Sequence, residues 1–372
     1  MKIAYIAPYR DASGYALAAR NNIGALHKVG VPLSVVPISF ESKKTDTGKL
    51  GKICDALQGS TDGCNIQIIH ATPPNIPRLI DRSKYNIGYV AWETSKLPPD
   101  WVGLINQLDE VWVPSIYNVH VFQDSGIKIP VIHIPHPMSS LEEERVNTDN
   151  RYILGIGDED FVFYSIFQWL ERKNPSGLLK AYLTEFEAEE KVCLVMKTFR
   201  ILPGMAQDED IIREQVGTFK SKMYLSSYPK ILLISNILSN AEMNALHNRG
   251  DCLVTLNRAE GFGLTITEAM RAGKPVIATN YGGPVDFLKQ AGGYLVPYQL
   301  TPVCGMPWEM YQADQLWAEP DVYTARQLMR QVYTNREEAK TRGLKGREWV
   351  KQYLSHEAIG QIMKGRLEAI KR

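Results

Sequence analysis

The chain has 372 residues, more than a single hydrophobic core usually supports, so two domains are expected. Its hydrophobic fraction of 44% and charged fraction of 22% are typical of a soluble globular protein. A formal net charge of +1 excludes a global electrostatic field that would attract nucleic acid or an anionic membrane.

The cysteines favour buried or incidental thiols over a disulfide framework, because they are odd in number, scattered and without zinc-ligand spacing. They are Cys54, Cys64, Cys193, Cys252 and Cys304. The first apolar run is broken at Pro8, too early for a signal peptide, and no run approaches the roughly 18 residues of a transmembrane helix. We therefore expect a cytoplasmic protein with no stable membrane span.

Short apolar runs in the first part of the chain predict buried parallel strands. They cover residues 3–7, 33–38, 66–70, 87–91, 110–113 and 131–134. A loop containing Ser13 and Gly14 follows the first run, and a helix is expected over about residues 15–29. Helical or loop segments separate the remaining runs, which is the alternation of a parallel α/β sheet.

The polar stretch 137–152, which is acidic at 142–144, predicts a linker. Strand-like runs then resume at 161–167, 192–197, 231–235, 252–256, 276–279 and 294–296. These patterns predict two α/β domains, over residues 1–145 and 146–350.

The segment from about residue 336 to 372 is predicted to be helical. Its last part, residues 351–372, is expected to pack back on the first domain. An apolar stripe at helical spacing would make that contact, consisting of Tyr353, Ile359, Ile362, Met363, Leu367 and Ile370.

A glycine-rich turn carries the most informative chemistry. The strand at 252–256 runs into Glu260, Gly261, Phe262 and Gly263, and a helix follows over about 264–272. Gly273 and Pro275 end that helix. Because a helix start presents unpaired N–H groups and the positive end of the helix dipole, this turn suits a diphosphate.

Two carboxylates flank the turn. Glu260 precedes it, and Glu268 lies one turn into the helix, where its side chain leans toward the helix start. An ionised carboxylate can accept two hydrogen bonds from a vicinal diol. A diphosphate between two diol-binding groups describes a nucleotide sugar. The alternative is that both glutamates are exposed and the glycines merely turn the chain.

Residues 260–270 (EGFGLTITEAM) and 273–279 (GKPVIAT) resemble the acid-x7-acid signature of retaining GT-B glycosyltransferases, in particular the large family four. Residues 280–284 and 317–321 also resemble that family, and so do 13–15, 92–94, 97–99 and 111–115 in the first half. The likeness covers roughly residues 155–330 most clearly. It implies an α/β GT-B fold, in which two Rossmann-like domains face each other across a cleft and a C-terminal helix crosses back.

By this resemblance, the first domain is the acceptor side and the second binds the nucleotide sugar. Glu268 would hold the ribose hydroxyls and Glu260 would contact the donor sugar. The turn at Gly261 would bring the amides of Phe262, Gly263 and Leu264 toward the diphosphate.

A basic pair, Arg172 and Lys173, follows the strand at 161–167. Fixed cations stabilise the charge that a departing diphosphate gains, and the family carries a basic pair here. Asn174 stands where many relatives have glycine. Lys197, at the end of the next strand, is a further candidate for the same cleft. An exposed basic turn and a surface lysine are the alternatives.

The first domain offers two further candidates. Gly14 lies after the first strand, at the edge where open sheets bind ligands, and a glycine lets a donor phosphate or acceptor approach closely. A plain turn is the alternative for Gly14. Many family members place a histidine after the strand at 87–91, where this chain has residues 92–94 (WET). Glu93 could accept a hydroxyl proton or hold the acceptor. A structural role for Glu93 is equally open.

The histidines do not obviously replace the missing one. His133 and His136 flank a strand end and are interpreted as packed side chains, and His70 remains an alternative. Donor-base recognition is placed near Asn236 and Ile237.

Two Asp-Glu-Asp triplets, at 158–160 and 208–210, raise the question of a metal ion, since some transferases hold a cation with an Asp-x-Asp pair. The first lies at a strand entrance and the second in a charged helical stretch. We expect no metal and no cofactor, because the helix terminus and the basic pair already supply positive charge.

These features predict a retaining transfer of a sugar from a UDP- or GDP-linked donor to an acceptor hydroxyl. The acceptor stays open: a glycan, a lipid carrier, a small molecule, a protein or a modified nucleobase in DNA. A noncatalytic nucleotide-sugar-binding protein and a GT-B phosphorylase or epimerase are the alternatives. A dinucleotide-binding oxidoreductase is disfavoured, because no Gly-x-Gly-x-x-Gly follows the first strand.

Overall fold

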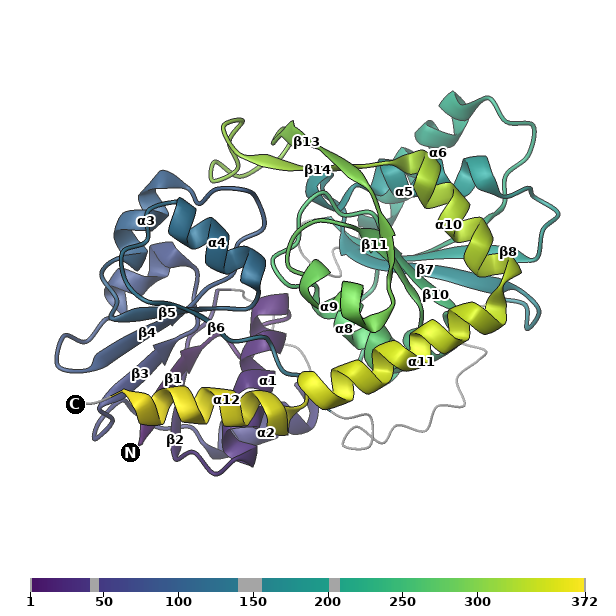
Figure 1. The fold of residues 1–372 in the computed structure, drawn as a ribbon. Helices are drawn as coiled ribbons and strands as arrows, with labels where there is room; N and C mark the ends of the chain where they lie inside the picture. The colour runs from purple at the N-terminus through teal and green to yellow at the C-terminus, as the bar shows by residue number, and fades with distance from the viewer. Residues whose placement is uncertain (1, 41–46, 140–155, 201–207, 371–372) are drawn as a thin grey trace.

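The computed structural model describes residues 2–40, 47–139, 156–200 and 208–370. Two parallel sheets stand side by side, each with helices on its faces (Figure 1). The predicted linker falls almost entirely outside the described residues, and so does the domain boundary placed at residue 145.

In the described residues, the first sheet has six parallel strands in the order β2-β1-β3-β4-β5-β6. They are β1 (Ile3–Ala7), β2 (Leu33–Pro37), β3 (Ile66–Ile69), β4 (Tyr85–Tyr89), β5 (Glu110–Val113) and β6 (Val131–His133). The connecting helices are α1 (Gly14–Lys28), α2 (Gly48–Ala56), η1 (Pro73–Arg78), α3 (Pro99–Ile105) and α4 (Ile116–Asp124). Ser13 caps α1 by accepting a hydrogen bond from the Ala16 amide, so the helix begins at the predicted loop.

The second sheet, counted over the same described ranges, has the order β12-β11-β10-β7-β8-β9. Its strands are β7 (Phe161–Gln168), β8 (Val192–Phe199), β9 (Lys230–Ile234), β10 (Cys252–Thr255), β11 (Val276–Thr279) and β12 (Tyr294–Val296). Its helices are η2 (Glu171–Lys173), α5 (Pro175–Glu185), α6 (Asp208–Met223), α7 (Asn240–Arg249), α8 (Leu264–Arg271), α9 (Val285–Ala291) and α10 (Val322–Thr334).

The strand order of the second sheet reverses between β7 and β10, and in such sheets ligands bind beyond the carboxyl ends of the strands at that point. All twelve strands predicted from the sequence are present, within one to two residues at most ends. The described structure therefore confirms the predicted α/β class and the GT-B arrangement.

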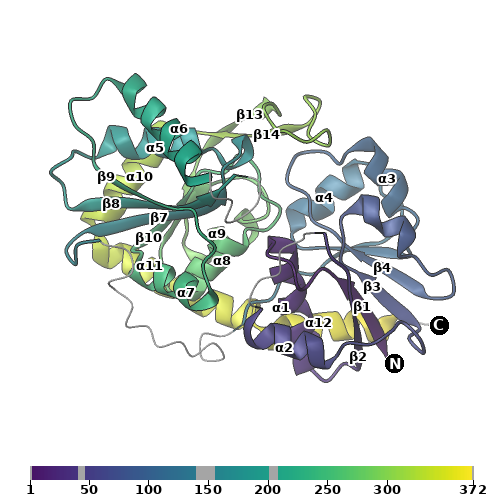
Figure 2. The ribbon, with the colours of Figure 1, turned by 180° about the vertical axis from the view of Figure 1, so that it is seen from behind.

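A hairpin of β13 (Tyr298–Pro302) and β14 (Leu316–Pro320) was not predicted. It leaves the second half and reaches toward the first (Figures 1 and 2). The sequence carries a signal for it, since the apolar side chains Tyr298 and Leu300 alternate with polar ones in β13.

The C-terminal helical segment is broken in two, as α11 (Arg336–Tyr353) and α12 (His356–Ala369). Ser355 caps α12, and the Met138 amide donates to the Leu354 carbonyl at 2.7 Å, which fixes the break beside the first half. From there α12 lies along α1, so the predicted crossing back is present (Figure 2). The predicted boundary after residue 350 stays a prediction.

The predicted apolar stripe is only partly correct. Ile359, Met363 and Leu367 are buried against the first half. Tyr353 and Ile362 are 49% and 48% exposed. Tyr353 ends α11 before the break at Leu354, and Ile362 lies beside the face of α12 that carries Ile359 and Met363.

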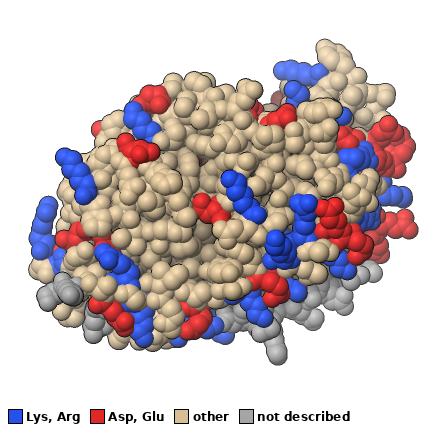
Figure 3. Space-filling model, in the orientation of Figure 1, with Lys and Arg blue, Asp and Glu red and all other residues tan. Residues whose placement is uncertain are grey.

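The cysteines and the charged side chains are distributed as expected from the composition. Four cysteines are buried, Cys304 is exposed, and all five are free. Basic and acidic side chains are interspersed on the face shown in Figure 3. In the part of the chain that the structure describes, no helix is both long and apolar enough to cross a membrane.

Two glycines of α12 test how closely that helix must approach α1. A Cβ atom at Gly360 would lie 2.6 Å from the Ala25 carbonyl oxygen and 2.8 Å from Val29 Cγ1, whereas one at Gly365 meets nothing within 4 Å. We predict that Gly360→Ala lowers the free energy of unfolding by about 1–3 kcal/mol, because the helices must separate.

Gly365→Ala is the matched control and should raise the free energy of unfolding by up to about 1 kcal/mol through helix propensity. Urea unfolding measures both variants. Equal stability of the two would contradict close packing of α12 on α1.

Candidate active site at the interdomain cleft

The predicted site residues follow β7 and β10, the two strands at the reversal point of the second sheet. Arg172 and Lys173 lie in η2 after β7, and the turn from Glu260 to Gly263 connects β10 to α8. Because both strands end at the same edge, these segments meet there.

The start of α8 leaves backbone donors available. Gly263 has φ +91°, which favours glycine, and no side chain caps the helix. In the described residues, the amides of Phe262, Gly263 and Leu264 donate to no acceptor, while Ile266 donates to the Gly263 carbonyl at 3.0 Å. The amides that the prediction requires are thus available, and their binding of a diphosphate stays a prediction.

The turn is clamped from both halves of the molecule. Ser115, from the first half, donates to the Gly261 carbonyl at 2.8 Å, and the Gly283 amide donates to the Glu260 carbonyl at 2.9 Å. The Phe262 ring is buried between His136 and Phe287, so only its backbone can face a ligand. A Cβ at Gly261 would lie 2.9 Å from the Trp92 carbonyl oxygen. The glycine therefore allows the halves to touch here.

All four residues predicted as catalytic lie in one cluster of ion pairs. Lys173 pairs closely with Glu260, which also accepts a hydrogen bond from Asn257 at 2.9 Å. Arg172 pairs with Glu93 of the first half, at 3.2 Å between Nη2 and Oε1. Their side chains are 12–21% exposed, so this is a largely buried cluster in contact with the cleft.

Burial and pairing act in opposite directions on the charges of this cluster. Burial alone would raise the pKa of Glu260, but Lys173 and Arg172 lower that pKa below its usual value. Burial would also lower the pKa of Arg172, but Glu93 raises it above the usual range. For Lys173, burial outweighs the pairing with Glu260 and lowers the pKa below its usual value.

The backbone conformation of Asn174 explains why an asparagine can stand where many relatives have glycine. It has φ 52° and ψ 53°, the left-handed conformation that asparagine tolerates better than most residues. Its side chain caps α5 by accepting from the Gly177 amide at 3.0 Å and donates to the Leu256 carbonyl at 3.1 Å. This residue ties η2 to the end of β10 and so places Arg172 and Lys173 beside the glycine turn.

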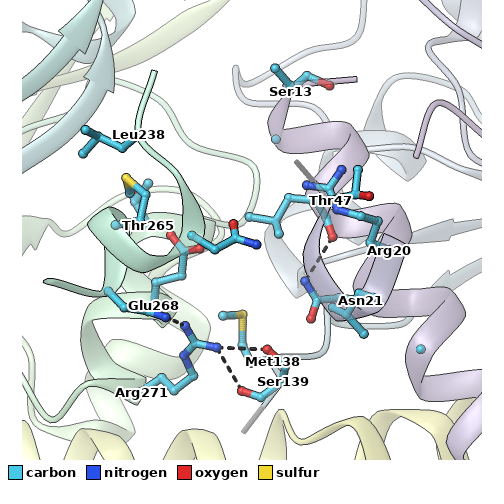
Figure 4. Close-up of a pocket in the computed structure, with 18 of the residues that line it drawn as sticks. Ser13, Arg20, Asn21, Thr47, Met138, Ser139, Leu238, Thr265, Glu268 and Arg271 are labelled. Carbon is cyan, nitrogen blue, oxygen red and sulfur yellow. Dashed lines mark hydrogen bonds between the residues drawn. The ribbon is translucent and has the colours of Figure 1, made fainter. Parts of the chain in front are cut away.

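A cavity of about 660 Å³ continues from the glycine turn between the two halves. Of the predicted residues, Gly14, Lys197, Ile237 and Glu268 line it. Figure 4 shows Thr265, Glu268 and Arg271 of α8 on one side and Arg20 and Asn21 of α1 on the other. Gly14 joins the cavity to the turn, since its Cβ position lies 3.8 Å from Leu264 Cδ1.

The lysine of this cavity is unusual. Lys197 is 6% exposed, and its ammonium group lies 5.6 Å from the centre of the Phe199 ring. Burial lowers the pKa of Lys197 to about 8. It is therefore a buried cation rather than the surface lysine of the alternative interpretation.

Comparison with known proteins finds similarity in a segment that includes the glycine turn. Residues 228–300 match the family described as glycosyl transferases group 1. A trehalose synthase of Rubrobacter xylanophilus is 25% identical over 190 residues, covering 49% of this chain and 44% of the relative. Sucrose synthase 2 of Pisum sativum is 26% identical over 186 residues, covering 48% of this chain and 22% of the relative. The chain thus spans less than half the length of these curated relatives.

Solved structures share the fold along the whole chain. The Anabaena protein HepE in complex with UDP-glucose has a TM-score of 0.68 at 14% identity, covering 100% of both chains. The sucrose-phosphate synthase of Thermosynechococcus elongatus has a TM-score of 0.69 at 15% identity, covering 99% of this chain and 98% of the other. Residues 228–300 thus resemble this glycosyltransferase family, and the chain has the GT-B fold.

Not every predicted residue reaches the site of this GT-B protein. Asn236 is exposed and does not line the cavity, whereas its neighbours Ile237 and Leu238 do. Glu268 does line it and lies 3.9 Å from Nε2 of His247. Burial lowers the pKa of His247 to about 3, so this contact is not an ion pair at neutral pH.

The three histidines considered from the sequence, His70, His133 and His136, are buried or half-buried side chains. His70 is 2% exposed, bonds to Tyr5 at 2.9 Å and stacks on Tyr89. Burial lowers the pKa of His136 to about 3, and burial also lowers the pKa of His133. None of these rings lines the cavity.

The acidic triplets lie away from the glycine turn. Asp160 sits at the entrance of β7, the end opposite the site, and pairs with Lys230 at 3.2 Å. The second triplet begins α6. No group of three or more potential metal ligands occurs among the described residues. The expectation of metal-independent chemistry stays a prediction.

Several cleft residues of the GT-B protein were missed from the sequence. Tyr311 bonds to Glu93 at 3.3 Å, and Tyr117 and Tyr281 bond to each other across the cleft at 2.9 Å. Ser115 lies in a segment whose family likeness was noticed, but its bond to Gly261 required the folded structure. Tyr311 lies beyond the unpredicted β13, so no pattern placed it.

Proposed function

We propose that the chain is a retaining, metal-independent glycosyltransferase that moves a sugar from a UDP- or GDP-linked donor to an acceptor hydroxyl. The observation that carries the proposal is the convergence of free α8 amides, two cations and Glu268 along one edge of the second sheet. The HepE complex with UDP-glucose supports a nucleotide-sugar donor. The predicted cytoplasmic location stays a prediction.

The donor would lie along α8. Its diphosphate would accept hydrogen bonds from the amides of Phe262, Gly263 and Leu264. Its ribose diol would bind Glu268 in the cavity, and the base would lie beside Ile237. Lys197, the buried cation of the same cavity, would add positive charge near the nucleotide.

Donor binding would exchange the partners of the ion-pair cluster. The cluster holds two carboxylates and two cations, so its charges cancel before the donor arrives. A diphosphate would draw Lys173 away from Glu260, and the released carboxylate could accept hydrogen bonds from donor-sugar hydroxyls. As the diphosphate departs, Arg172 and Lys173 would stabilise its growing charge.

Retention of the anomeric configuration would follow if the acceptor hydroxyl attacked the donor sugar on the same face from which the diphosphate leaves. Each carboxylate nearest the cleft already has partners, since Glu260 binds Lys173 and Asn257 while Glu93 binds Arg172. This supports a mechanism without a covalent sugar–enzyme intermediate. The bond from the anomeric carbon to the donor phosphate would break, a new bond to the acceptor oxygen would form, and the leaving phosphate would accept the hydroxyl proton.

Glu268→Gln tests the ribose contact. The loss of a charge-assisted hydrogen bond should weaken UDP binding by about 1.5–3 kcal/mol, or roughly 10- to 100-fold in Kd. Calorimetry with UDP and 2′-deoxy-UDP measures this directly. The wild type should prefer UDP, and the variant should bind both about equally.

Glu357→Gln, an exposed position on α12, is the control and should bind UDP as the wild type does. Unchanged preference for UDP in Glu268→Gln would contradict the ribose assignment, whereas absence of binding to both UDP and GDP in the wild type and every variant would contradict the proposed function.

The lowered pKa of Lys197 predicts that UDP binding depends on pH. The lysine is cationic below its pKa of about 8 and becomes neutral above it, so UDP affinity should fall as pH rises from 7 to 9. Lys197→Arg keeps its charge throughout this range and should flatten the profile. Because the ligand is the same, its own titration cancels in the comparison. Identical profiles for the wild type and Lys197→Arg would exclude this lysine from the nucleotide site.

A further inference from the structure

The hairpin of β13 and β14 belongs to the second half but docks on the first (Figure 1). Its landing site is the segment 92–96, which directly follows the loop after β4. The family resemblance placed a histidine in this segment, and the chain has Glu93 instead. The hairpin therefore docks on the segment in which this chain departs from the family pattern.

The docking contacts are specific and partly buried. Thr94 donates to Gln315 Oε1 at 2.8 Å, and the two side chains are fully buried. The Ser95 amide donates to the Leu316 carbonyl at 3.0 Å, while the Leu316 amide donates to Ser95 Oγ at 2.8 Å. Backbone and side-chain bonds together fix the register of the hairpin on the first half.

Tyr311, between the two hairpin strands, is brought by this docking onto Glu93. Its ring stacks on Trp92 with centroids 5.1 Å apart, and its hydroxyl donates to Glu93 Oε2 at 3.3 Å. The other oxygen of Glu93 faces Arg172 at 3.2 Å. Glu93 is thus held at both oxygens by residues of the other half.

The Tyr311 hydroxyl remains a hydrogen-bond donor in this position. Burial raises the pKa of Tyr311 above its usual value, and the Glu93 charge raises it further. The hydroxyl therefore stays protonated and points its hydrogen at a carboxylate that cannot donate. A carboxylate on a loop would otherwise sample several rotamers, and the bond selects one of them.

We propose that Tyr311 is a positioning residue, which holds the Glu93 carboxylate of the acceptor side in one orientation between its own hydroxyl and Arg172. This assignment rests on the proposed function. It means that the acceptor side is complete only when the hairpin of the second half is docked. The contacts of Tyr311 with Trp92 and Glu93 carry the inference. The Tyr311 hydroxyl also lies close to Arg172 and helps to raise the pKa of that residue.

A double-mutant cycle tests the assignment, with UDP release from UDP-glucose as the assay. Tyr311→Phe keeps the ring and removes the hydroxyl, and Glu93→Gln removes the charge that the hydroxyl binds. Each single variant should lower kcat about tenfold or more, with KM for UDP-glucose changed less than about twofold. If Tyr311 acts through Glu93, the double variant should be no slower than Glu93→Gln alone.

Tyr323→Phe, 63% exposed on α10, is the matched control and should behave as the wild type. The positioning role would be overturned if the kcat losses of the two single variants multiplied in the double variant. It would also be overturned if Tyr311→Phe lowered only the melting temperature. Either result would leave the proposed function intact. A wild-type chain that binds neither UDP nor GDP, and releases neither from a UDP- or GDP-linked sugar, would overturn the proposed function itself.

Discussion

Two buried ion pairs at the carboxyl edge of the second sheet set the geometry on which the site depends. Lys173 with Glu260 joins the segments after β7 and β10, and Arg172 with Glu93 joins the two halves of the molecule. Such pairs cost desolvation energy, so stability alone is a poor reason for them. Under the proposed function, their charges cancel until the donor diphosphate enters and interacts with both cations.

The glycine turn depends on the same interface. Gly261 touches the backbone at Trp92, and Ser115 holds its carbonyl from the first half. The free amides at the start of α8 are therefore aligned by contacts from both halves. The crossing of α12 onto α1 keeps those halves together at one end of the cleft, and the docked hairpin does so at the other. In this arrangement, motion between the halves would disturb donor and acceptor groups together.

Much of the fold could be predicted from the sequence, because short apolar runs bounded by loops report buried parallel strands directly. The glycine turn and Glu268 could be predicted for the same local reason, since strand, turn and helix are consecutive. The pairing of Arg172 with Glu93 could not, because the two are 79 positions apart and meet only through the interface. The helix break at Leu354 likewise depends on Met138, which no helical periodicity reports.

The central claim is that Lys173 exchanges Glu260 for the leaving diphosphate, and the turnover of Lys173→Ala tests it most directly. Lys180→Ala, an exposed lysine on α5, is the matched control. With UDP-glucose, the account predicts a kcat about 100- to 1,000-fold below that of the control, with a much smaller change in KM. A kcat equal to that of Lys180→Ala would show that Lys173 only pairs with Glu260, and would contradict the account.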